Sequence, residues 1–331
     1  MLRRAGHVAL VAVGLTALAL IVRHIGLATI AGLLRQVGWS FWWIVLIYAA
    51  HTALRGLALW RTLPAGALPL ADVVAIRFGT EGVEMLTLTG PLLAEPAKAW
   101  LLHRRGIDGP AAVGAVATEY VLYNLTAAWV GAGALTLLLA AGALPGALGP
   151  PAKGLLVAVA LLTIGCVIAG VTGRRLVEPA VRAVALRVAP RRADAAVAAV
   201  QRIEGVLVGV LKDDPRRLAT LLAVELASHA LLALEVLVTL HAIGVYPGLR
   251  SAFVIEGGVK WIGTLFFFVP GQVGVSEGMY ALLLPAVGLP AAAGVTIALI
   301  RRARALTVGG LGFLLIAAPS RNRPRPRQDG E

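Results

Sequence analysis

Long apolar segments follow one another along almost the whole chain, with short polar stretches between them. Most are close to the roughly 20 residues that a helix needs to cross a bilayer. The pattern predicts an all-α, polytopic membrane helical bundle, with one membrane domain over residues 1–318 and a disordered basic tail over 319–331. The segments lie near residues 6–24, 40–60, 71–88, 111–141, 152–173, 217–242, 251–269 and 289–318.

The longest polar interval, residues 174–217, contains apolar side chains at helical spacing. Because this spacing places them on one face, the interval is expected to include an amphipathic helix. Its apolar positions are Val197, Val200, Ile203, Leu207 and Leu211.

Composition and charge support the membrane assignment. The 331 residues are 59% hydrophobic and only 14% charged, whereas soluble domains average about 25% charged residues. The net charge of +13 raises the question of nucleic acid, but no nucleic-acid motif accompanies the basic residues. We therefore expect membrane lipid, and no nucleic acid, as the partner.

Basic residues also predict the orientation, because cytoplasmic loops of membrane proteins are enriched in Lys and Arg. Twenty fall on one predicted side: ten in residues 174–217, four in the tail and six elsewhere, Lys98 among them. Only four fall on the other side. Both termini are therefore expected in the cytoplasm of a bacterial-type inner (plasma) membrane. An even number of crossings then requires residues 71–105 and 251–288 to form re-entrant, broken hairpins.

Two apolar segments are interrupted by glycine and proline, and a glutamate follows each break. Lipid cannot satisfy the backbone groups that a break releases, so a break is tolerated only inside protein or beside a water-filled cavity. Paired breaks are typical of transport sites near the bilayer midplane. The first break contains Gly90 and Pro91 before Glu95, and the second contains Pro270, Gly271 and Gly274 before Glu277.

The two halves, about 1–143 and 150–318, have the same element order with opposite predicted topology. Arg77 and Glu81 precede Pro91 by 14 and 10 residues, and Glu256 and Lys260 precede Pro270 by the same distances with the charges reversed. Glu95 and Glu119 are 24 residues apart, as are Glu277 and Arg301. The spacing favours an inverted repeat, in which Glu119 and Arg301 would face each other; chance is the alternative.

Charged side chains inside the apolar segments are the candidate functional residues. A charge at the bilayer centre costs at least ~2.5–3.5 kcal/mol, and such residues usually face the bundle interior. Structural ion pairs are the alternative for Arg77–Glu81 and Glu256–Lys260. For Arg302 and Arg304, phosphate binding competes with extension toward an interface. The candidate substrate- or ion-binding residues are Glu95, Glu277, Arg77, Glu81, Glu119, Glu256, Lys260, Arg301, Glu225 and His229.

Motifs for other functions are missing from the sequence. It contains no phosphate-binding P-loop, no His-Glu-x-x-His and no Gly-x-Ser-x-Gly. Cys166 is the only cysteine, which leaves no metal-binding cysteine set. We therefore expect no cofactor, no metal, no enzymatic activity and no ATP-driven movement by the chain itself.

The two broken segments resemble those of a known family. Residues 268–278 resemble the Pro-Gly-x-x-Gly-x-x-Glu-Gly segment of the flippase-like, lysylphosphatidylglycerol synthase transmembrane-region family, and residues 89–102 are similar to its Pro-x-x-x-Gly-Glu segment. Glu119 and Arg301 look like further family residues, whereas Ala94 stands where the family usually has glycine. The aminoacyl-transferase domain of true synthases is absent, so that activity is not carried over.

The resemblance implies an inner-membrane protein that moves a lipid, glycolipid or polyprenyl-type substrate between leaflets. We expect Glu95 and Glu277 to bind a cation or head group, and Arg77, Lys260 or Arg301 to offset an anionic head group. Two alternatives stay open: an integral membrane enzyme that modifies a lipid head group, and a scaffold for a partner lipid-pathway enzyme docked on residues 174–217. The sequence does not give the substrate or the oligomeric state.

Overall fold

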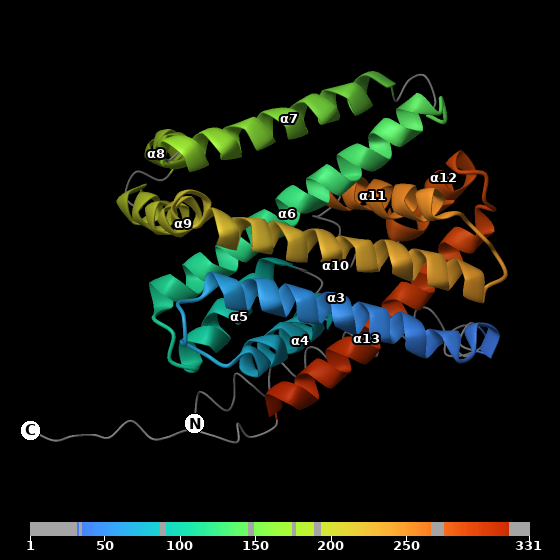
Figure 1. The fold of residues 1–331 in the computed structure, drawn as a ribbon, viewed down its shortest axis with the longest axis horizontal. Helices are drawn as coiled ribbons and strands as arrows, with labels where there is room; N and C mark the ends of the chain where they lie inside the picture. The colour runs from blue at the N-terminus through green and yellow to red at the C-terminus, as the bar shows by residue number, and fades with distance from the viewer. Residues whose placement is uncertain are drawn as a thin grey trace, which may run out of the picture.

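The computed structural model describes residue 32 and residues 35–86, 91–144, 149–173, 177–188, 193–265 and 275–317. The described residues form helices and no strand (Figure 1), which confirms the all-α prediction. Gly90, Pro270, Gly271, Gly274 and the tail 319–331 lie outside them. The helices are α3 (Ser40–Thr62), α4 (Leu70–Leu86), α5 (Pro91–Arg104), α6 (Gly109–Ala140), α7 (Gly149–Thr172), α8 (Val177–Val188), α9 (Ala193–Asp213), α10 (Pro215–Ala242), α11 (Leu249–Leu265), α12 (Val275–Ala286) and α13 (Ala292–Ala317).

Length and apolar composition distinguish helices that can cross a membrane from the shorter helices of the two broken segments. Four described helices, α3, α6, α7 and α10, are long and apolar enough to cross a membrane. The helices of the two broken segments, α4 with α5 and α11 with α12, have only 12 to 17 residues. At about 1.5 Å per residue, they are shorter than the roughly 30 Å hydrocarbon core. The re-entrant paths stay predictions, because the residues between the paired helices lie outside the described ranges.

Helices α3 and α10 run antiparallel through the middle of the bundle (Figure 1). Arg217, near the start of α10, donates from Nε to the carbonyl oxygen of Arg61 at 2.6 Å and from Nη2 to that of Leu63 at 3.2 Å. These carbonyls belong to the end of α3, where the helix leaves them without intrahelical partners. The contact holds the start of α10 against the end of α3.

Each half of the chain repeats the same set of helix neighbours. Helices α3 to α6 surround one apolar cluster, and α10 to α13 surround another. Across the halves, α4 packs on α13 and α6 packs on α11. Matched neighbours and antiparallel central helices are what an inverted repeat requires. The repeat itself stays a prediction, because both breaks include residues outside the described part of the chain.

Glycine allows the two halves to approach closely. An ideal Cβ built on Gly312 of α13 would lie 2.1 Å from the carbonyl oxygen of Phe78 in α4, and one on Gly257 of α11 would lie 2.8 Å from that of Val130 in α6. Real Cβ atoms do not approach carbonyl oxygens at such distances, so a side chain would force the backbones apart. Small residues serve this purpose at helix interfaces in membranes.

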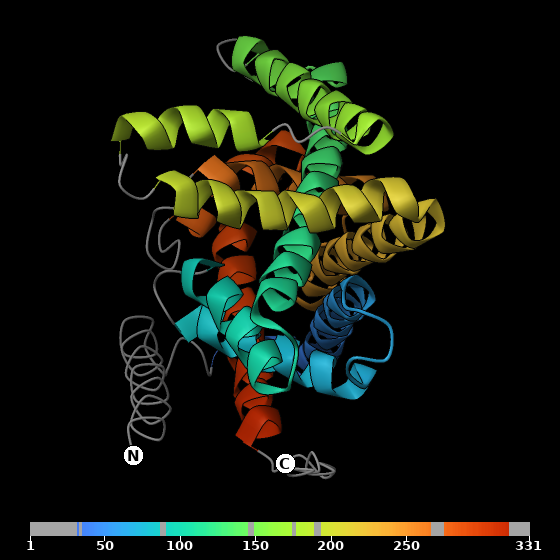
Figure 2. The same ribbon diagram turned by 90° about the vertical axis from the view of Figure 1, so that its left-hand side faces the viewer.

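Helices α7, α8 and α9 form an outer layer. Helix α7 packs mainly on α6 and α9 and leaves large apolar side chains exposed, including Leu161, Val167 and Val171. Helices α8 and α9 are seen end-on in Figure 1 and lengthwise in Figure 2, so they lie across the direction of α3 and α10. Helix α9 confirms the amphipathic helix predicted in residues 174–217, with Val197 and Val210 buried.

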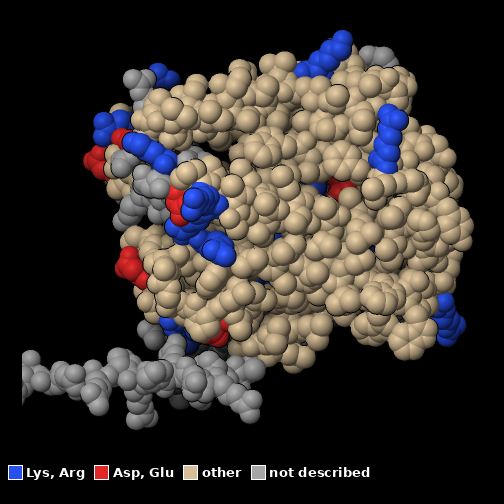
Figure 3. All heavy atoms as spheres, in the orientation of Figure 1, with Lys and Arg blue, Asp and Glu red and all other residues tan. Residues whose placement is uncertain are grey.

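Charged side chains gather over α8, α9 and the start of α10, while most of the visible face is uncharged (Figure 3). This distribution is the one that the basic-residue count predicts for a cytoplasmic end. The orientation stays a prediction, as do the domain boundaries.

Gly312→Ala is expected to lower the free energy of unfolding in detergent by about 1–3 kcal/mol, the usual cost of overpacking. Gly310→Ala is the matched control, because a Cβ there meets nothing within 4 Å and alanine favours a helix. Thermal unfolding of both variants checks the prediction. Equal melting temperatures would contradict the proposed close contact between α4 and α13.

Candidate functional site

Buried charged and polar side chains lie near the midpoints of the bundle helices. His51 is the middle residue of α3, Arg77 is next to the middle of α4, and Glu256 is next to the middle of α11. All three are at most 3% exposed. Because the middle of a bundle helix is the part expected farthest from water, each charge there needs a partner within the protein.

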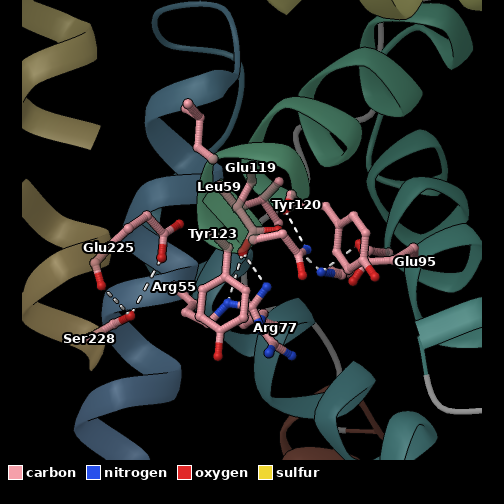
Figure 4. Close-up of polar contacts among 12 residues, drawn as sticks. Arg55, Leu59, Arg77, Glu95, Glu119, Tyr120, Tyr123, Glu225 and Ser228 are labelled. Atoms are coloured by element: carbon pink, nitrogen blue, oxygen red, sulfur yellow. Dashed lines mark hydrogen bonds and ion pairs between the residues drawn. The ribbon is translucent and has the colours of Figure 1, made fainter. Parts of the chain in front are cut away.

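The first cluster is centred on Glu119 of α6 (Figure 4). Its Oε1 accepts hydrogen bonds from Arg55 of α3, with Nη2 at 2.7 Å and Nε at 3.0 Å. Its Oε2 lies 3.3 Å from Nζ of Lys98 in α5, and that Nζ also lies 2.7 Å from Oε2 of Glu95. Glu119 and Lys98 are fully buried, whereas the Glu95 side chain is 15% exposed. One carboxylate thus holds cations from two other helices.

The position of Lys98 corrects the sequence-based interpretation. We had counted Lys98 with the cytoplasmic basic residues, but it is fully buried and pairs with Glu95 and Glu119. The spacing of Glu95 and Lys98, i to i+3 on one helix, was visible in the sequence and signals an ion pair. Without Lys98, nineteen basic residues against four still favour the same orientation.

Arg77 and Glu81 of α4 form the ion pair expected from their spacing, with Nη1 2.8 Å from Oε2. Both are buried, and Tyr48 of α3 donates a hydrogen bond to Oε1 of Glu81. Nε of Arg77 is buried without a hydrogen-bond partner among the described residues. Nε of Arg77 is therefore available to donate a hydrogen bond to another acceptor.

The second cluster is centred on Arg301 of α13. Its Nη2 lies 2.6 Å from Oε2 of Glu256 in α11, and its Nη1 donates to the hydroxyl of Tyr280 in α12 at 2.6 Å. The other oxygen of Glu256 lies 3.0 Å from Nζ of Lys260, which confirms the expected pair. Arg304, one turn from Arg301, donates from Nε to Glu235 of α10 at 2.6 Å.

The structure gives the partners that spacing alone left open. Glu119 and Arg301, which an inverted repeat would place facing each other, have other partners: Glu119 pairs with Arg55 and Lys98, and Arg301 pairs with Glu256. Of the two alternatives for Arg304, extension toward an interface is excluded, since the residue is 6% exposed and bonded to Glu235. Sequence spacing gives the helical face of a residue, but not the neighbouring helix which that face meets.

Two tyrosine rings connect the clusters. The guanidinium carbon of Arg304 lies 3.4 Å from the ring centroid of Tyr48, whose hydroxyl binds Glu81. On Tyr123 of α6, the guanidinium carbon of Arg55 lies 3.7 Å from the ring centroid and Nζ of Lys260 lies 5.8 Å from it. Sequence reasoning did not assign Tyr48 and Tyr123 to the site, although both occur near charges on polar helix faces. The polar interior is therefore one connected network.

Glu225 and His229 of α10 are also buried in this interior. Of the two glutamates that follow the breaks, Glu95 joins the first cluster, whereas the side chain of Glu277 lies outside the described placements. Pro91 is the first residue of α5. No group of three or more His, Cys, Asp or Glu residues in the described part of the chain is arranged to hold a metal ion.

Comparison with protein families identifies the chain. The model of the family described as "Lysylphosphatidylglycerol synthase TM region" matches residues 7–312. The chain belongs to this family. Comparisons with curated proteins and with solved structures gave no match. Membership confirms the resemblance of the broken segments and makes this a membrane protein linked to lipid metabolism.

Glu119→Gln is expected to destabilise this family member by about 3–5 kcal/mol, because it leaves buried cations without their counter-charge. Arg55→Gln combined with Glu119→Gln should cost less than the sum of the two single changes, since the residues are in direct contact. Unfolding in detergent of the four proteins in this cycle checks the coupling. Additive losses would contradict the Arg55–Glu119 pair.

Proposed function

We propose that this protein moves a lipid or a lipid-linked substrate between the two leaflets of a bacterial-type inner membrane, without ATP of its own. The observation that carries the proposal is the connected network of buried, ion-paired side chains near the midpoints of the bundle helices. A polar head group can cross hydrocarbon only where protein supplies charges and hydrogen bonds in place of water.

Stability alone is a poor explanation for this network. Replacing a buried ion pair by well-packed apolar residues is often neutral or stabilising, by about 1–4 kcal/mol in known cases. The interior nevertheless holds Arg55–Glu119, Arg77–Glu81 and Glu256–Arg301. Retaining costly charges there is expected where they contact a substrate or an ion.

An anionic head group fits the basic residues of the first cluster together with Arg77. Arg55, Arg77 and Lys98 come from three helices, and Nε of Arg77 is buried with no acceptor among the described residues. The guanidinium group matches the geometry of phosphate oxygens. Lys98 lies between Glu95 and Glu119, so a phosphate that bound Lys98 would compete with both carboxylates. Glu119 would then still be paired with Arg55, and Glu95 is partly exposed, so a head group can bind Lys98 without leaving a fully buried carboxylate unpaired.

In this proposal the head group enters at Glu95. The Glu95 side chain is more exposed than the other side chains in these ion pairs. Access from the side would let the acyl chains stay in lipid while only the head group passes through the protein.

Glu95→Gln is expected to slow lipid movement at least about tenfold, a barrier increase of ~1.4 kcal/mol. The change removes the outer partner of Lys98 but leaves Lys98 paired with Glu119, so the fold should remain. Vesicles containing the purified protein and fluorescent lipid analogues, anionic and zwitterionic in separate batches, measure the rate from quenching of the outer leaflet.

Asp72→Asn is the matched control, because Asp72 pairs with Arg105 at the surface, 2.7 Å away, outside the network. Unchanged rates in Glu95→Gln would contradict the assignment of the site. Head-group chemistry found by mass spectrometry of the recovered lipids would favour the membrane-enzyme alternative. A wild-type protein that moves no lipid, combined with loss of function in cells on neutralising the basic residues of 174–217, would favour the scaffold.

A further inference from the structure

We propose that Glu225 and His229 of α10 form a proton-binding site, through which proton movement is coupled to lipid movement. The site is distinct from the ion-paired network, and its coupling to lipid rests on the proposed function. Two buried atoms, about one turn apart on this helix, lack a hydrogen-bond partner among the described residues.

The carboxyl group of Glu225 has no ion pair among the described residues. Glu225 is fully buried, and within the described part of the chain its Oε1 has no hydrogen-bond partner. Its Oε2 lies 3.5 Å from the Ser228 hydroxyl, which already donates to the Glu225 carbonyl oxygen at 2.8 Å. A buried carboxylate without a donor is costly, whereas a proton neutralises it. By contrast, Glu119 and Glu256 each pair with two basic residues.

The hydrogen bonds of His229 determine which of its ring nitrogens can accept a proton. Its Nε2 lies 3.3 Å from the carbonyl oxygen of Tyr123, which can only accept, so Nε2 carries the proton. The Thr126 hydroxyl, 3.1 Å from Nε2, donates to backbone carbonyls and therefore also accepts from His229. Nδ1 of His229 is buried, and no described residue offers it a hydrogen bond. In the neutral ring this atom has a lone pair, so it can take up a proton.

Glu225 and His229 lie close together, at the depth in the membrane where a proton carrier is needed. Glu225 and His229 are four residues apart, and residues at this spacing are neighbours on a helix surface. They lie 10 and 14 residues from Pro215, the start of α10, which is roughly 15 and 21 Å along the axis. The middle of a hydrocarbon core about 30 Å thick lies at this depth.

A second histidine approaches the same turn from α3. Nδ1 of His51 lies 3.0 Å from the carbonyl oxygen of Ser228, and it donates because that oxygen can only accept. The Tyr123 ring lies between the histidines, with its centroid 6.2 Å from that of His51 and 4.7 Å from that of His229. Since Arg55 stacks on the same ring, a proton gained at this turn changes the charge beside the Arg55–Glu119 pair.

Charges from several packed helices act on the two groups, and they supply the coupling. Glu119 is among the charged groups that act on Glu225, and Lys260 and Glu256 are among those that act on His229. A head group that displaces these pairs would therefore alter proton binding, and proton binding would alter the pairs. The groups are His51 and Arg55 of α3, Arg77 of α4, Lys98 of α5, Glu119 and Tyr123 of α6, and Glu256 and Lys260 of α11.

Infrared difference spectroscopy of the full-length protein in lipid nanodiscs tests the site without any transport. A protonated-carboxyl C=O band should titrate with pH in the wild type and disappear in Glu225→Gln. Asp194→Asn is the matched control, because Asp194 is exposed on α9, and it should retain the band. A band that persists in Glu225→Gln, or no titrating carboxyl band in the wild type, would overturn the proposal.

Coupling is tested in the fluorescent-lipid vesicles by imposing a pH gradient. A gradient should change the wild-type rate at least tenfold, and the change should vanish in His229→Gln. His241→Gln is the control, because His241 is exposed on the same helix. A gradient effect that survives in His229→Gln refutes the coupling. If the wild type moves no lipid but the Glu225 band titrates, the proton site stands and the proposed function fails.

Discussion

Pairing of charges in a medium that cannot solvate them is the constraint on which this structure depends. An isolated charge in the membrane interior is costly, and the cost is reduced only when an opposite charge or a hydrogen bond is held at the right distance. Glu119 joins α3, α5 and α6 in this way, and Arg301 joins α11, α12 and α13. The polar contacts thus fix which helices meet, whereas apolar packing, which is less specific, fills the space between them.

Close backbone approach makes these pairings possible. The glycines of α4 and α13 remove the separation that side chains would impose, and Arg304 of α13 lies over the Tyr48 ring, whose hydroxyl binds Glu81 of α4. The corresponding contact between α6 and α11 brings Lys260 toward Tyr123. Backbone contact and polar contact therefore reinforce each other, since a wider helix spacing would move these cations away from the tyrosine rings of the other half.

Much of the fold could be predicted from the sequence because a membrane imposes simple rules on it. The length of apolar runs gave the helices, the spacing of Val197 and its neighbours gave α9, and i to i+4 spacing gave Arg77–Glu81 and Glu256–Lys260. Each of these signals is local. The family resemblance, carried by the two broken segments, was confirmed as well.

Pairs between helices could not be predicted, because their geometry depends on how helices cross. Lys98 had the appearance of a surface residue near a helix end, and only the packing of α5 on α6 shows that it meets Glu119. The role of Tyr48 depends on three helices, and that of Tyr123 depends on four. Sequence spacing identified the charged positions, but a rotation of one helix by a few tens of degrees would have exchanged their partners.

The loose attachment of α7 has a consequence for how the protein senses its surroundings. With 24 residues, α7 is about 36 Å long, which exceeds the hydrocarbon thickness of roughly 30 Å. A helix of this length tilts as the bilayer becomes thinner, and few neighbours restrain it. Because α9 packs on both α7 and α6, a change in the tilt of α7 would alter the packing around the helix that carries Glu119.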